Sequence, residues 1–475
     1  MKFTKFNAKI QSSLSTIFNK YPLVRTIIHK IHEIGGTPYL VGGAVRDLIL
    51  DVYVKDLDIE IHGLPLETVE KVLSDFGSVD MVGKSFGVLR ISALDVDWSL
   101  PRADSVGRKP IVTIDPAMDI IKALRRRDLT MNAMAINLIT KELVDPFDGL
   151  NDMQAKRLRT PDCQFFIEDP LRFYRVMQFI ARFEMNPDLE LNELCIHMNL
   201  RGVSQERISG EFEKMFLKSV RPSLGFRWIA YIGRLQELLP ELGDLVGVAQ
   251  DPGWHPEGDV FEHTMQVIDA AAQLTYKDSR EKLVIMLAAL CHDLGKATKT
   301  EMINGHLKSI GHAHASVEIA KRLLSRITIK KELTSLVLTL VENHSQPLIF
   351  ISENAGPAAY KRLAKKIAPD VTLEMLALLA RADRRGRNPQ KGFPLEVHDE
   401  TDVDLFLERA RKAFVSLQAE LPILYGRDFL AIVSPGPVLG KLVDRAYALQ
   451  IDQSIHDKDM LKKLVLEEYK AGIIK

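Results

Sequence analysis

The chain has 475 residues, which at about 150 residues per domain predicts roughly three domains. Hydrophobic residues make up 46% and charged residues 27%, as in ordinary soluble proteins, and no apolar run reaches the ~20 residues that span a membrane. The 63 basic and 63 acidic residues cancel, so net charge neither supports nor excludes a nucleic-acid partner, because local patches govern phosphate binding. Three widely spaced cysteines indicate neither a disulfide framework nor a Cys-based zinc site, which favours a reducing, cytoplasmic location.

The first 32 residues contain basic residues and no acid. This composition fits either a transit peptide or a basic extension that leads into a helix. Helical spacing recurs at Val24, Ile27, Ile28, Ile31 and Ile34, which favours the second interpretation from Pro22 onward. We therefore expect a helix here that covers the domain behind it.

Residues 38–62 read PYLVGGAVRDLILDVYVKDLDIEIH, an order that predicts strand, glycine turn, helix and strand. Glycines at such a turn let backbone N–H groups approach an anion, and the helix N-terminus favours phosphate. Gly43 and Arg46 are therefore candidate triphosphate ligands. Residues two apart in a strand share a face, so Asp56 and Asp58 are expected to project together. Such a pair suits Mg²⁺, which proteins hold with one or two carboxylates plus substrate phosphates.

The next candidates are an acid and an arginine farther along this part of the chain. Asp97 follows an alternating run and would bring a third carboxylate, acting either as general base on an attacking hydroxyl or as a metal ligand. Residues 102–119 are rich in turn formers and lack clear periodicity, which predicts a long loop that is either functional or disordered. Arg127, in LRRRDLTMNAMAIN, is a candidate for contacts with triphosphate oxygens, while Asp128 and Asn132 are spaced to share a helix face.

The segment EDPLRFYRVMQFIARF, residues 168–183, predicts a helix that can choose a nucleobase. Asp169 and Arg172 are three apart and can lie side by side. Cytosine and adenine both present an amino donor beside a ring-nitrogen acceptor, whereas guanine and uracil present the reverse. A carboxylate accepts from the amino group and a guanidinium donates to the ring nitrogen, so this pair would accept CTP and ATP and reject GTP and UTP. Arg175, one turn further on, is expected near the same nucleotide.

A second set of metal-binding residue types follows a Pro- and Gly-rich break at residues 249–259, which we interpret as a domain boundary. His263 opens an apolar helical stretch, the adjacent His292 and Asp293 end another, and Asp383 lies on a third. Imidazole and carboxylate ligands together suit a divalent transition metal or Mg²⁺. A metal held in this way activates water for phosphoester cleavage.

The motifs of the first half resemble, in this order, those of the nucleotidyltransferase superfamily. GG-x-V-R-D with D-x-D, RRD-xxx-NA, DPFDG at residues 145–149 and EDxxR are similar in form to those of bacterial tRNA CCA-adding enzymes and their poly(A) polymerase relatives. The resemblance implies Mg²⁺ at Asp56 and Asp58, and template-independent addition of C, C and A to tRNA 3′ ends from CTP and ATP. A poly(A) polymerase of the same fold is the nearest alternative.

The order H…HD…D resembles the HD metal-dependent phosphohydrolases, which have an all-helical fold. The resemblance implies a divalent-metal site, with Ni²⁺, Mn²⁺ and Mg²⁺ as candidate ions, whose ligands are His263, His292, Asp293 and Asp383. Lys296 is expected near the phosphate, and His312 and His344 are candidates for a second metal. Some bacterial CCA-adding enzymes carry such a domain with phosphatase, 2′-nucleotidase and 2′,3′-cyclic phosphodiesterase activities. The alternative from another class is an HD phosphohydrolase whose head only binds RNA.

We therefore expect an α+β chain, with a nucleotidyltransferase head of a small β-sheet and helices followed by all-α neck, body, HD and tail domains. The expected boundaries are 1–150 for the head, 151–250 for the neck and body, 251–395 for the HD domain and 396–475 for the tail. Gly436, Gly440 and Lys441 at a helix start in the tail are candidates for a tRNA contact. The expected partners are tRNA, CTP and ATP, with no membrane, and the sequence leaves monomer and homodimer open.

Overall fold

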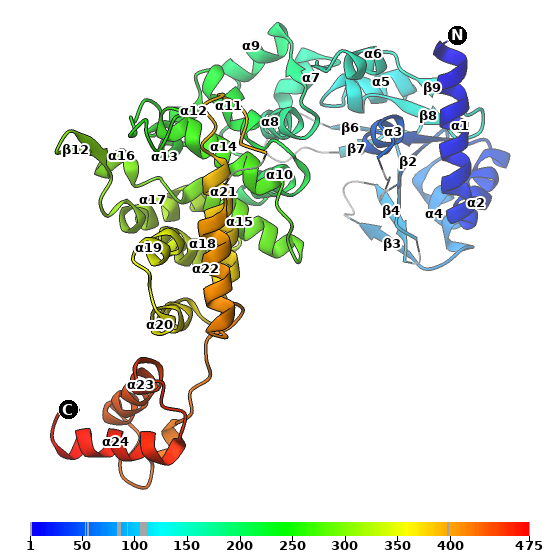
Figure 1. The fold of residues 1–475 in the computed structure, drawn as a ribbon. Helices are drawn as coiled ribbons and strands as arrows, with labels where there is room; N and C mark the ends of the chain where they lie inside the picture. Colours follow the sequence, from blue (N-terminus) through cyan, green and yellow to red (C-terminus); the bar gives the residue numbers. More distant parts are fainter. Residues whose placement is uncertain are drawn as a thin grey trace. The chain divides into compact units, whose positions relative to one another are not determined.

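The computed structural model describes residues 2–52, 54, 57–82, 87–92, 94–104, 112–396 and 399–474 (Figure 1). The chain divides into two compact units, which we call the N-terminal unit (Met1–Glu211 with Tyr231–Arg234) and the C-terminal unit (Phe212–Ala230 with Leu235–Lys475). The first contains a mixed sheet and the second is mainly helical, so the predicted α+β class is confirmed. The finer division into head, neck and body, HD and tail domains stays a prediction. Among the described residues, every helix is too short or too polar to cross a membrane.

A mixed sheet organises the described part of the N-terminal unit, with strand order β3-β4-β5-β2-β1-β8-β9. Its strands are β1 (Thr37–Val41), β2 (Leu57–His62), β3 (Val79–Val82), β4 (Val88–Ile91), β5 (Val96–Ser99), β8 (Ala135–Asn137) and β9 (Leu143–Val144). β2 and β5 run parallel, and the other neighbouring strands run antiparallel. Leu57, Ile59 and Ile61 alternate along β2 and are buried, so the residues between them face the other side of the sheet.

Helices cover this sheet and continue the unit beyond it. They are α1 (Lys2–Lys20), α2 (Pro22–Glu33), α3 (Gly43–Ile49), α4 (Leu66–Ser74), α5 (Ile120–Arg125), α6 (Gly149–Gln154), α7 (Cys163–Glu168), α8 (Leu171–Phe183), α9 (Leu189–His197) and the first part of α10 (Gln205–Lys218), with the short helix η1 (Thr130–Asn132). α2 packs against α4 and β1 through its buried apolar residues, so the expected covering helix is confirmed.

Short strands complete the described part of the N-terminal unit: β6 (Arg102–Asp104), β7 (Val112–Ile114), β10 (Arg157–Leu158) and β11 (Asn186–Pro187). β6 and β7 pair as antiparallel strands. The prediction of a loop throughout residues 102–119 is therefore wrong at residues 102–104 and 112–114, where backbone pairing outweighs the turn-forming composition. Residues 105–111 lie outside the described part of the chain.

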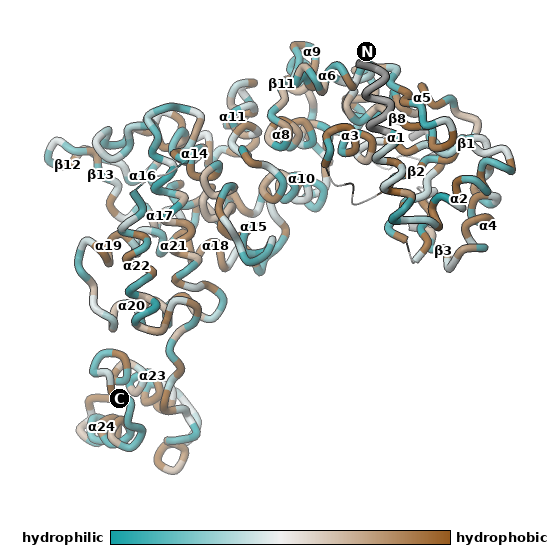
Figure 2. The backbone as a smooth tube through the Cα atoms, turned by 45° about the vertical axis from the view of Figure 1, so that its right-hand side comes forward, coloured by the Kyte–Doolittle hydropathy of each residue, from teal (hydrophilic) through white to brown (hydrophobic). Residues whose placement is uncertain are grey.

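The C-terminal unit is built from helices, and its chain changes repeatedly between hydrophobic and hydrophilic residues (Figure 2). They are α11 (Ser223–Tyr231), α12 (Leu235–Leu238), α13 (Pro240–Gly243), α14 (Val260–Ala272), α15 (Ser279–Cys291), α16 (Lys296–Lys299), α17 (His312–Ile327), α18 (Lys331–Asn343), α19 (Gln346–Ser352), α20 (Pro357–Ile367), α21 (Leu373–Arg385) and α22 (Thr401–Lys412), with the hairpin β12 (Glu301–Ile303) and β13 (His306–Lys308). α15 is buried at every residue from Leu283 to Cys291 and packs against α14, α18 and α21. It is therefore the central helix of the group.

The last helices, α23 (Pro437–Asp452) and α24 (Lys458–Lys470), follow the short helix η2 (Gly426–Asp428) and share an apolar cluster of their own. Phe429, Leu442 and Leu461 are at its centre and fully buried. The prediction of a helical tail is confirmed here, with Gly436 immediately before α23.

Candidate functional sites

The glycine turn between β1 and α3 lies at one end of the sheet. Gly42 has φ +66° and ψ −132°, a conformation that favours glycine. A Cβ atom at Gly42 would lie 3.1 Å from Nη1 of Arg127, and one at Gly43 would lie 3.3 Å from Nη2 of Arg46. The predicted order of strand, turn, helix and strand is thus present, and two guanidinium groups lie against the turn.

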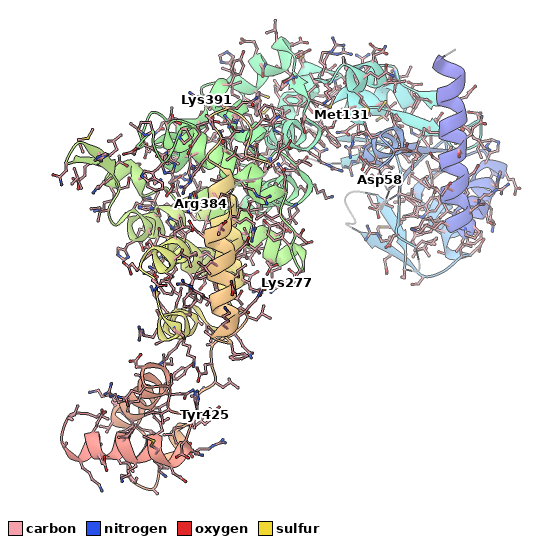
Figure 3. The ribbon with its side chains drawn as sticks, in the orientation of Figure 1. Asp58, Met131, Lys277, Arg384, Lys391 and Tyr425 are labelled. Carbon is pink, nitrogen blue, oxygen red and sulfur yellow. The ribbon has the colours of Figure 1, made fainter. Side chains whose placement is uncertain are left out.

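Two carboxylates lie beside each other on neighbouring strands of the sheet. Asp58 on β2 (Figure 3) and Asp97 on β5 are Cα partners in the parallel ladder, so their side chains leave the same face. Asp97 accepts a hydrogen bond of 2.7 Å from Nε of Arg90, its paired residue on the neighbouring strand β4. Asp56 lies outside the described residues, so its predicted pairing with Asp58 stays a prediction.

Glu60 adds a third carboxylate to this face, and the sequence analysis missed it. It lies two residues after Asp58 on β2 and is buried, where it accepts hydrogen bonds from Nε2 of His62 (2.9 Å) and Nη2 of Arg127 (3.4 Å). Burial alone would raise the pKa of Glu60, but the hydrogen bond from His62 and the charge of Arg127 lower it below its usual value. The alternation D-x-D-x-E in the sequence was the available signal.

Arg46 is buried and held from two sides. Its Nη1 donates to Oδ1 of Asn132 at 2.6 Å, and its guanidinium carbon lies 5.4 Å from the ring centre of Phe179 and 4.9 Å from that of Phe183. Both phenylalanines belong to α8, so cation–π contacts connect the helix to the glycine turn.

Asp128 continues this chain of contacts to α8. Its Oδ1 accepts from Nδ2 of Asn132 at 3.0 Å, and its Oδ2 accepts from Nε of Arg175 at 2.6 Å. Burial would raise the pKa of Asp128, but Arg175 and Asn132 outweigh it and lower the pKa to about 2. Asp128 and Asn132 meet as expected from their spacing, although a turn and η1 connect them instead of a regular helix.

Asp169 and Arg172 are close in the chain but bind different partners. Asp169 precedes α8, where its Oδ1 accepts from the backbone N–H of Leu171 (3.1 Å) and its Oδ2 from Nη2 of Arg207 (2.7 Å). Arg172 donates to the backbone oxygens of Phe165 (2.5 Å) and Arg126 (2.6 Å). Arg207 was not predicted as a partner, because 38 residues separate it from Asp169. The assignment of base choice to this pair stays a prediction.

A group of imidazole and carboxylate side chains meets at the ends of α14, α15 and α21. Nε2 of His263 lies 3.0 Å from Oδ1 of Asp383 and 3.3 Å from Nε2 of His292. Oδ2 of Asp293 lies 3.3 Å from Nε2 of His292 and 2.8 Å from Nζ of Lys296. The structure therefore brings together the four residues predicted as metal ligands, and Lys296 with them.

Two more histidines approach the other oxygen of Asp293. Nε2 of His312 lies 3.2 Å from Oδ1 of Asp293 and 3.1 Å from Nε2 of His344. Burial and the nearby His292 lower the pKa of His344 to about 4, so its imidazole is neutral at pH 7 as a metal ligand requires. Burial would raise the pKa of Asp293, but His292 and Lys296 lower it well below its usual value.

The hydrogen bonds of the histidines test whether this group fits a metal. Nδ1 of His292, His312 and His344 lies within 2.8 Å of a backbone oxygen, and Nδ1 of His263 lies 2.7 Å from Oε1 of Glu257. If each imidazole is neutral and donates from Nδ1, each Nε2 carries a lone pair, and these lone pairs face each other across 3.1–3.3 Å. A cation between them relieves this repulsion, so the residues fit a divalent metal.

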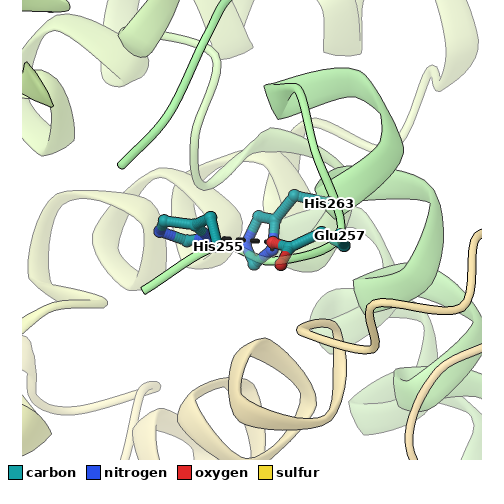
Figure 4. Close-up of side chains that lie close together, drawn as sticks. All are labelled: His255, Glu257 and His263. Carbon is teal, nitrogen blue, oxygen red and sulfur yellow. Dashed lines mark hydrogen bonds and ion pairs between the residues drawn. The ribbon is translucent and has the colours of Figure 1, made fainter. Parts of the chain in front are cut away.

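Glu257 is a further residue that the sequence analysis missed. It lies in the Pro- and Gly-rich segment before α14 and is fully buried beside His255 and His263 (Figure 4). This segment lies inside the C-terminal unit. The only signal was a His and a Glu shortly before the predicted ligand His263, in a stretch whose composition indicated a break.

Two family models match the chain. The first, described as the poly A polymerase head domain, matches residues 38–159, which include the glycine turn and the carboxylates. The second, described as the HD domain, matches residues 260–384, which include the histidine and aspartate group.

Among relatives, the multifunctional CCA protein of Pasteurella multocida is 35% identical over 376 residues, which cover 75% of this chain and 87% of the relative. That of Mannheimia succiniciproducens is 33% identical over 380 residues, covering 77% and 87%. Among solved structures, a CCA-adding enzyme of Bacillus stearothermophilus in complex with CTP aligns with a TM-score of 0.63 at 18% identity, covering 94% of this chain and 96% of that one. A Thermotoga maritima CCA-adding enzyme complexed with tRNA aligns with a TM-score of 0.59 at 19% identity, covering 97% and 98%. The overall fold is therefore shared with these structures.

Proposed function

The chain belongs to the family of multifunctional CCA proteins, and on this basis we propose that it adds C, C and A to the 3′ ends of tRNA from CTP and ATP without a template. The observation that carries the proposal is the placement of Asp58 and Asp97 side by side on one sheet face, in the same unit as a glycine turn with arginines against it. tRNA, CTP and ATP are the proposed partners, and the free cysteines fit a cytoplasmic location.

In the proposed reaction, the tRNA 3′-hydroxyl attacks the α-phosphorus of the nucleotide, the bond to the bridging oxygen breaks, and pyrophosphate leaves. Asp97 accepts the hydroxyl proton, while the ion pair with Arg90 holds its carboxylate in place. Asp58 and Asp56 hold Mg²⁺, which supplies positive charge to the reacting phosphate. Gly43, Arg46 and Arg127 hold the triphosphate.

Base choice is proposed for the start of α8. Asp169 accepts the amino hydrogen bond of C or A, and Arg172 donates to the ring nitrogen. Each of these side chains exchanges a protein partner for the base, because Asp169 is paired with Arg207 and Arg172 with backbone oxygens. Arg175 remains hydrogen-bonded to Asp128 and is proposed to lie next to the same base.

The experiment that tests CCA addition uses tRNA that lacks its last three nucleotides. The purified chain with Mg²⁺ and CTP is expected to add C residues and stop, and with both nucleotides to complete CCA. Addition of many A residues without CTP would contradict the proposal and favour the poly(A) polymerase alternative.

A second activity is proposed for the C-terminal unit, namely metal-dependent hydrolysis of phosphoesters such as 2′,3′-cyclic nucleotides. His263, His292, Asp293 and Asp383 are the proposed ligands, and the bound metal supplies an activated water and a positive charge for the phosphate. Four imidazoles in the group favour Ni²⁺ over Mn²⁺ and Mg²⁺, which prefer oxygen ligands. His312 and His344 approach Oδ1 of Asp293, opposite to the first set, and are proposed to hold a second ion.

Hydrolysis of 2′,3′-cyclic AMP by the full chain tests this activity. Turnover with Ni²⁺ or Mn²⁺ that EDTA abolishes is the expected result. Absence of turnover with each of Ni²⁺, Mn²⁺ and Mg²⁺ would contradict it.

A further inference from the structure

Glu257 places one carboxylate oxygen between two imidazoles. Its Oε1 lies 2.7 Å from Nδ1 of His263 and 2.8 Å from Nδ1 of His255 (Figure 4). Its other oxygen, Oε2, is buried and has no hydrogen-bond partner within the described part of the chain. An ionised carboxylate only accepts hydrogen bonds, so both imidazoles donate to it from Nδ1.

This arrangement fixes the direction of both rings. In the neutral imidazole that metal binding requires, donation from Nδ1 of His263 leaves the lone pair on Nε2, and that atom faces Oδ1 of Asp383 and Nε2 of His292 in the proposed metal site. With Nδ1 of His255 donating, its Nε2 also carries a lone pair, and that atom lies 3.5 Å from Nζ of Lys296. The carboxylate of Glu257 therefore orients Nε2 of one imidazole toward the metal site and Nε2 of the other toward Lys296.

Lys296 has acceptors on all sides as a result. Besides Nε2 of His255, its ammonium group lies 2.8 Å from Oε1 of Gln250 and 2.8 Å from Oδ2 of Asp293. An ammonium group has three hydrogens, so these three acceptors determine its position. His255 and Gln250 come from the segment before α14, and Asp293 comes from the end of α15.

Another buried glutamate, Glu262 in the first turn of α14, shows what distinguishes Glu257. Glu262 lies five residues further on and binds Nη1 and Nη2 of Arg227 at 2.6 and 3.0 Å, an ordinary bidentate ion pair. Within the described residues, the hydrogen bonds of Glu257 come from two imidazoles. Burial of a carboxylate is costly unless hydrogen bonds satisfy it, and two imidazoles donate these bonds to Glu257.

We propose that Glu257 is a shared positioning residue of the phosphohydrolase site, which holds His263 in its metal-ligating tautomer and, through His255, holds Lys296 in place for the substrate phosphate. The proposal rests on the phosphohydrolase activity proposed above. It adds two residues that act on the site through others, since neither Glu257 nor His255 has to touch the metal or the substrate.

Binding of Ni²⁺ alone to the full chain, measured by calorimetry, tests the first half. Loss of an outer hydrogen bond to a metal-ligating histidine typically weakens metal binding 10–100-fold, so we expect about 10-fold weaker binding for Glu257→Gln and about 100-fold for Glu257→Leu. Glu262→Gln, a change to a buried carboxylate outside the site, is the matched control and is expected to bind Ni²⁺ as the wild type does. Circular dichroism in EDTA shows whether each variant is folded, and Glu257→Gln decides if Glu257→Leu is not.

Wild-type affinity in the folded Glu257 variants would overturn the first half, because the backbone oxygen of Gly386, 3.2 Å from Nδ1 of His263, would then be sufficient to hold the ring. His263→Ala separates this failure from that of the proposed activity. If His263→Ala and the wild type bind Ni²⁺ equally, the metal site itself is refuted, and the proposal with it.

His255→Asn tests the second half. It is expected to bind Ni²⁺ like the wild type but to show about a 10-fold higher KM for 2′,3′-cyclic AMP, because the position of Lys296 is lost while the metal ligands remain. An unchanged KM would overturn the role of His255. A loss of Ni²⁺ affinity in His255→Asn would also overturn it, since His255 would then act on the metal site rather than on Lys296.

Discussion

The two candidate sites of this chain surround similar carboxylates with different groups. In the N-terminal unit, Asp97 and Glu60 are paired with arginines, and the other groups come from strand positions that face one side of a sheet. In the C-terminal unit, Asp293 and Asp383 are paired with Lys296 and Arg387 and also lie among imidazoles whose Nε2 atoms point inward. The first arrangement pairs carboxylates with arginines, whereas the second also brings imidazole Nε2 atoms within 3.3 Å of each other, which fits a cation between them.

This difference indicates how each site acquires its ion. Proteins hold Mg²⁺ through few carboxylates and the phosphates of the substrate, so the first site needs to bind the ion only together with a nucleotide. Imidazoles oriented by hydrogen bonds at Nδ1 form a site that is ready before substrate arrives. We therefore expect the two sites to differ in metal dependence and to fail independently.

The largest expected effect comes from removing one carboxylate or one imidazole. Asp58→Ala is expected to lower CCA addition about 10³-fold or more and to leave hydrolysis of 2′,3′-cyclic AMP unchanged, because it removes a ligand of the nucleotide-borne metal only. His263→Ala is expected to do the reverse. Assays of both activities on both variants check this. Intact CCA addition in Asp58→Ala would favour the alternative of a phosphohydrolase whose head only binds RNA.

A smaller effect is expected from a change at the residues of the N-terminal unit that are proposed to select the base. Arg172→Ala is expected to lower kcat/KM for CTP about 10²-fold, since a hydrogen bond from a charged group is lost, and to reduce the preference for CTP over UTP by a similar factor. Arg182→Ala, on the same helix but in contact with Asp47, is the control and is expected to keep that preference. The ratio of the two kcat/KM values does not depend on how much enzyme is folded. An unchanged ratio in Arg172→Ala would refute the proposed reading of the base.

Metal binding is expected to stabilise one unit and not the other. At a Ni²⁺ concentration of about 100 times Kd, the free energy of unfolding of the C-terminal unit should rise by about 2.7 kcal/mol over that in EDTA. The N-terminal unit should unfold at the same temperature in both conditions when no nucleotide is present. Scanning calorimetry checks this, and the same rise in His263→Ala would place the ion elsewhere.

The smallest effect concerns the pH dependence of the N-terminal unit. The pKa of Asp128 is about 2 in the folded chain, against 3.8 for an unperturbed aspartate, so its contribution is fully present above about pH 4 and is lost as the pH falls through 2. It amounts to about 2 kcal/mol at 1.36 kcal/mol per pKa unit. The difference in unfolding free energy between wild type and Asp128→Asn should therefore shrink below pH 4. A difference that stays constant with pH would show that Asp128 is not held by its charge.

The local parts of both sites could be predicted from the sequence. The turn at Gly42, the strand of Asp58 and the adjacent His292 and Asp293 each lie within a short segment whose composition determines its structure. Helix period and strand alternation are properties of neighbouring residues, so they can be read without the fold. The buried helix that delivers His292 is of this kind.

Partners that come from distant segments could not be predicted. Asp97 lies beside Asp58 only because β2 and β5 run parallel, and nothing within either strand specifies that pairing. Arg207 reaches Asp169 from another helix. Glu257 was hidden for a different reason, since Pro and Gly around it indicate a break, while its burial depends on two imidazoles that the fold brings to it.

The contacts of Arg46 limit how the enzyme can treat nucleotides of different size. Asn132 and the rings of Phe179 and Phe183 hold this arginine at once, so the glycine turn cannot move away from α8 without breaking contacts of Arg46. A purine is larger than a pyrimidine. The distance between the residues proposed to bind the triphosphate and those proposed to select the base, Asp169 and Arg172, nevertheless cannot increase without breaking these contacts. The space for the larger purine base therefore has to come from parts of the molecule other than the glycine turn and α8.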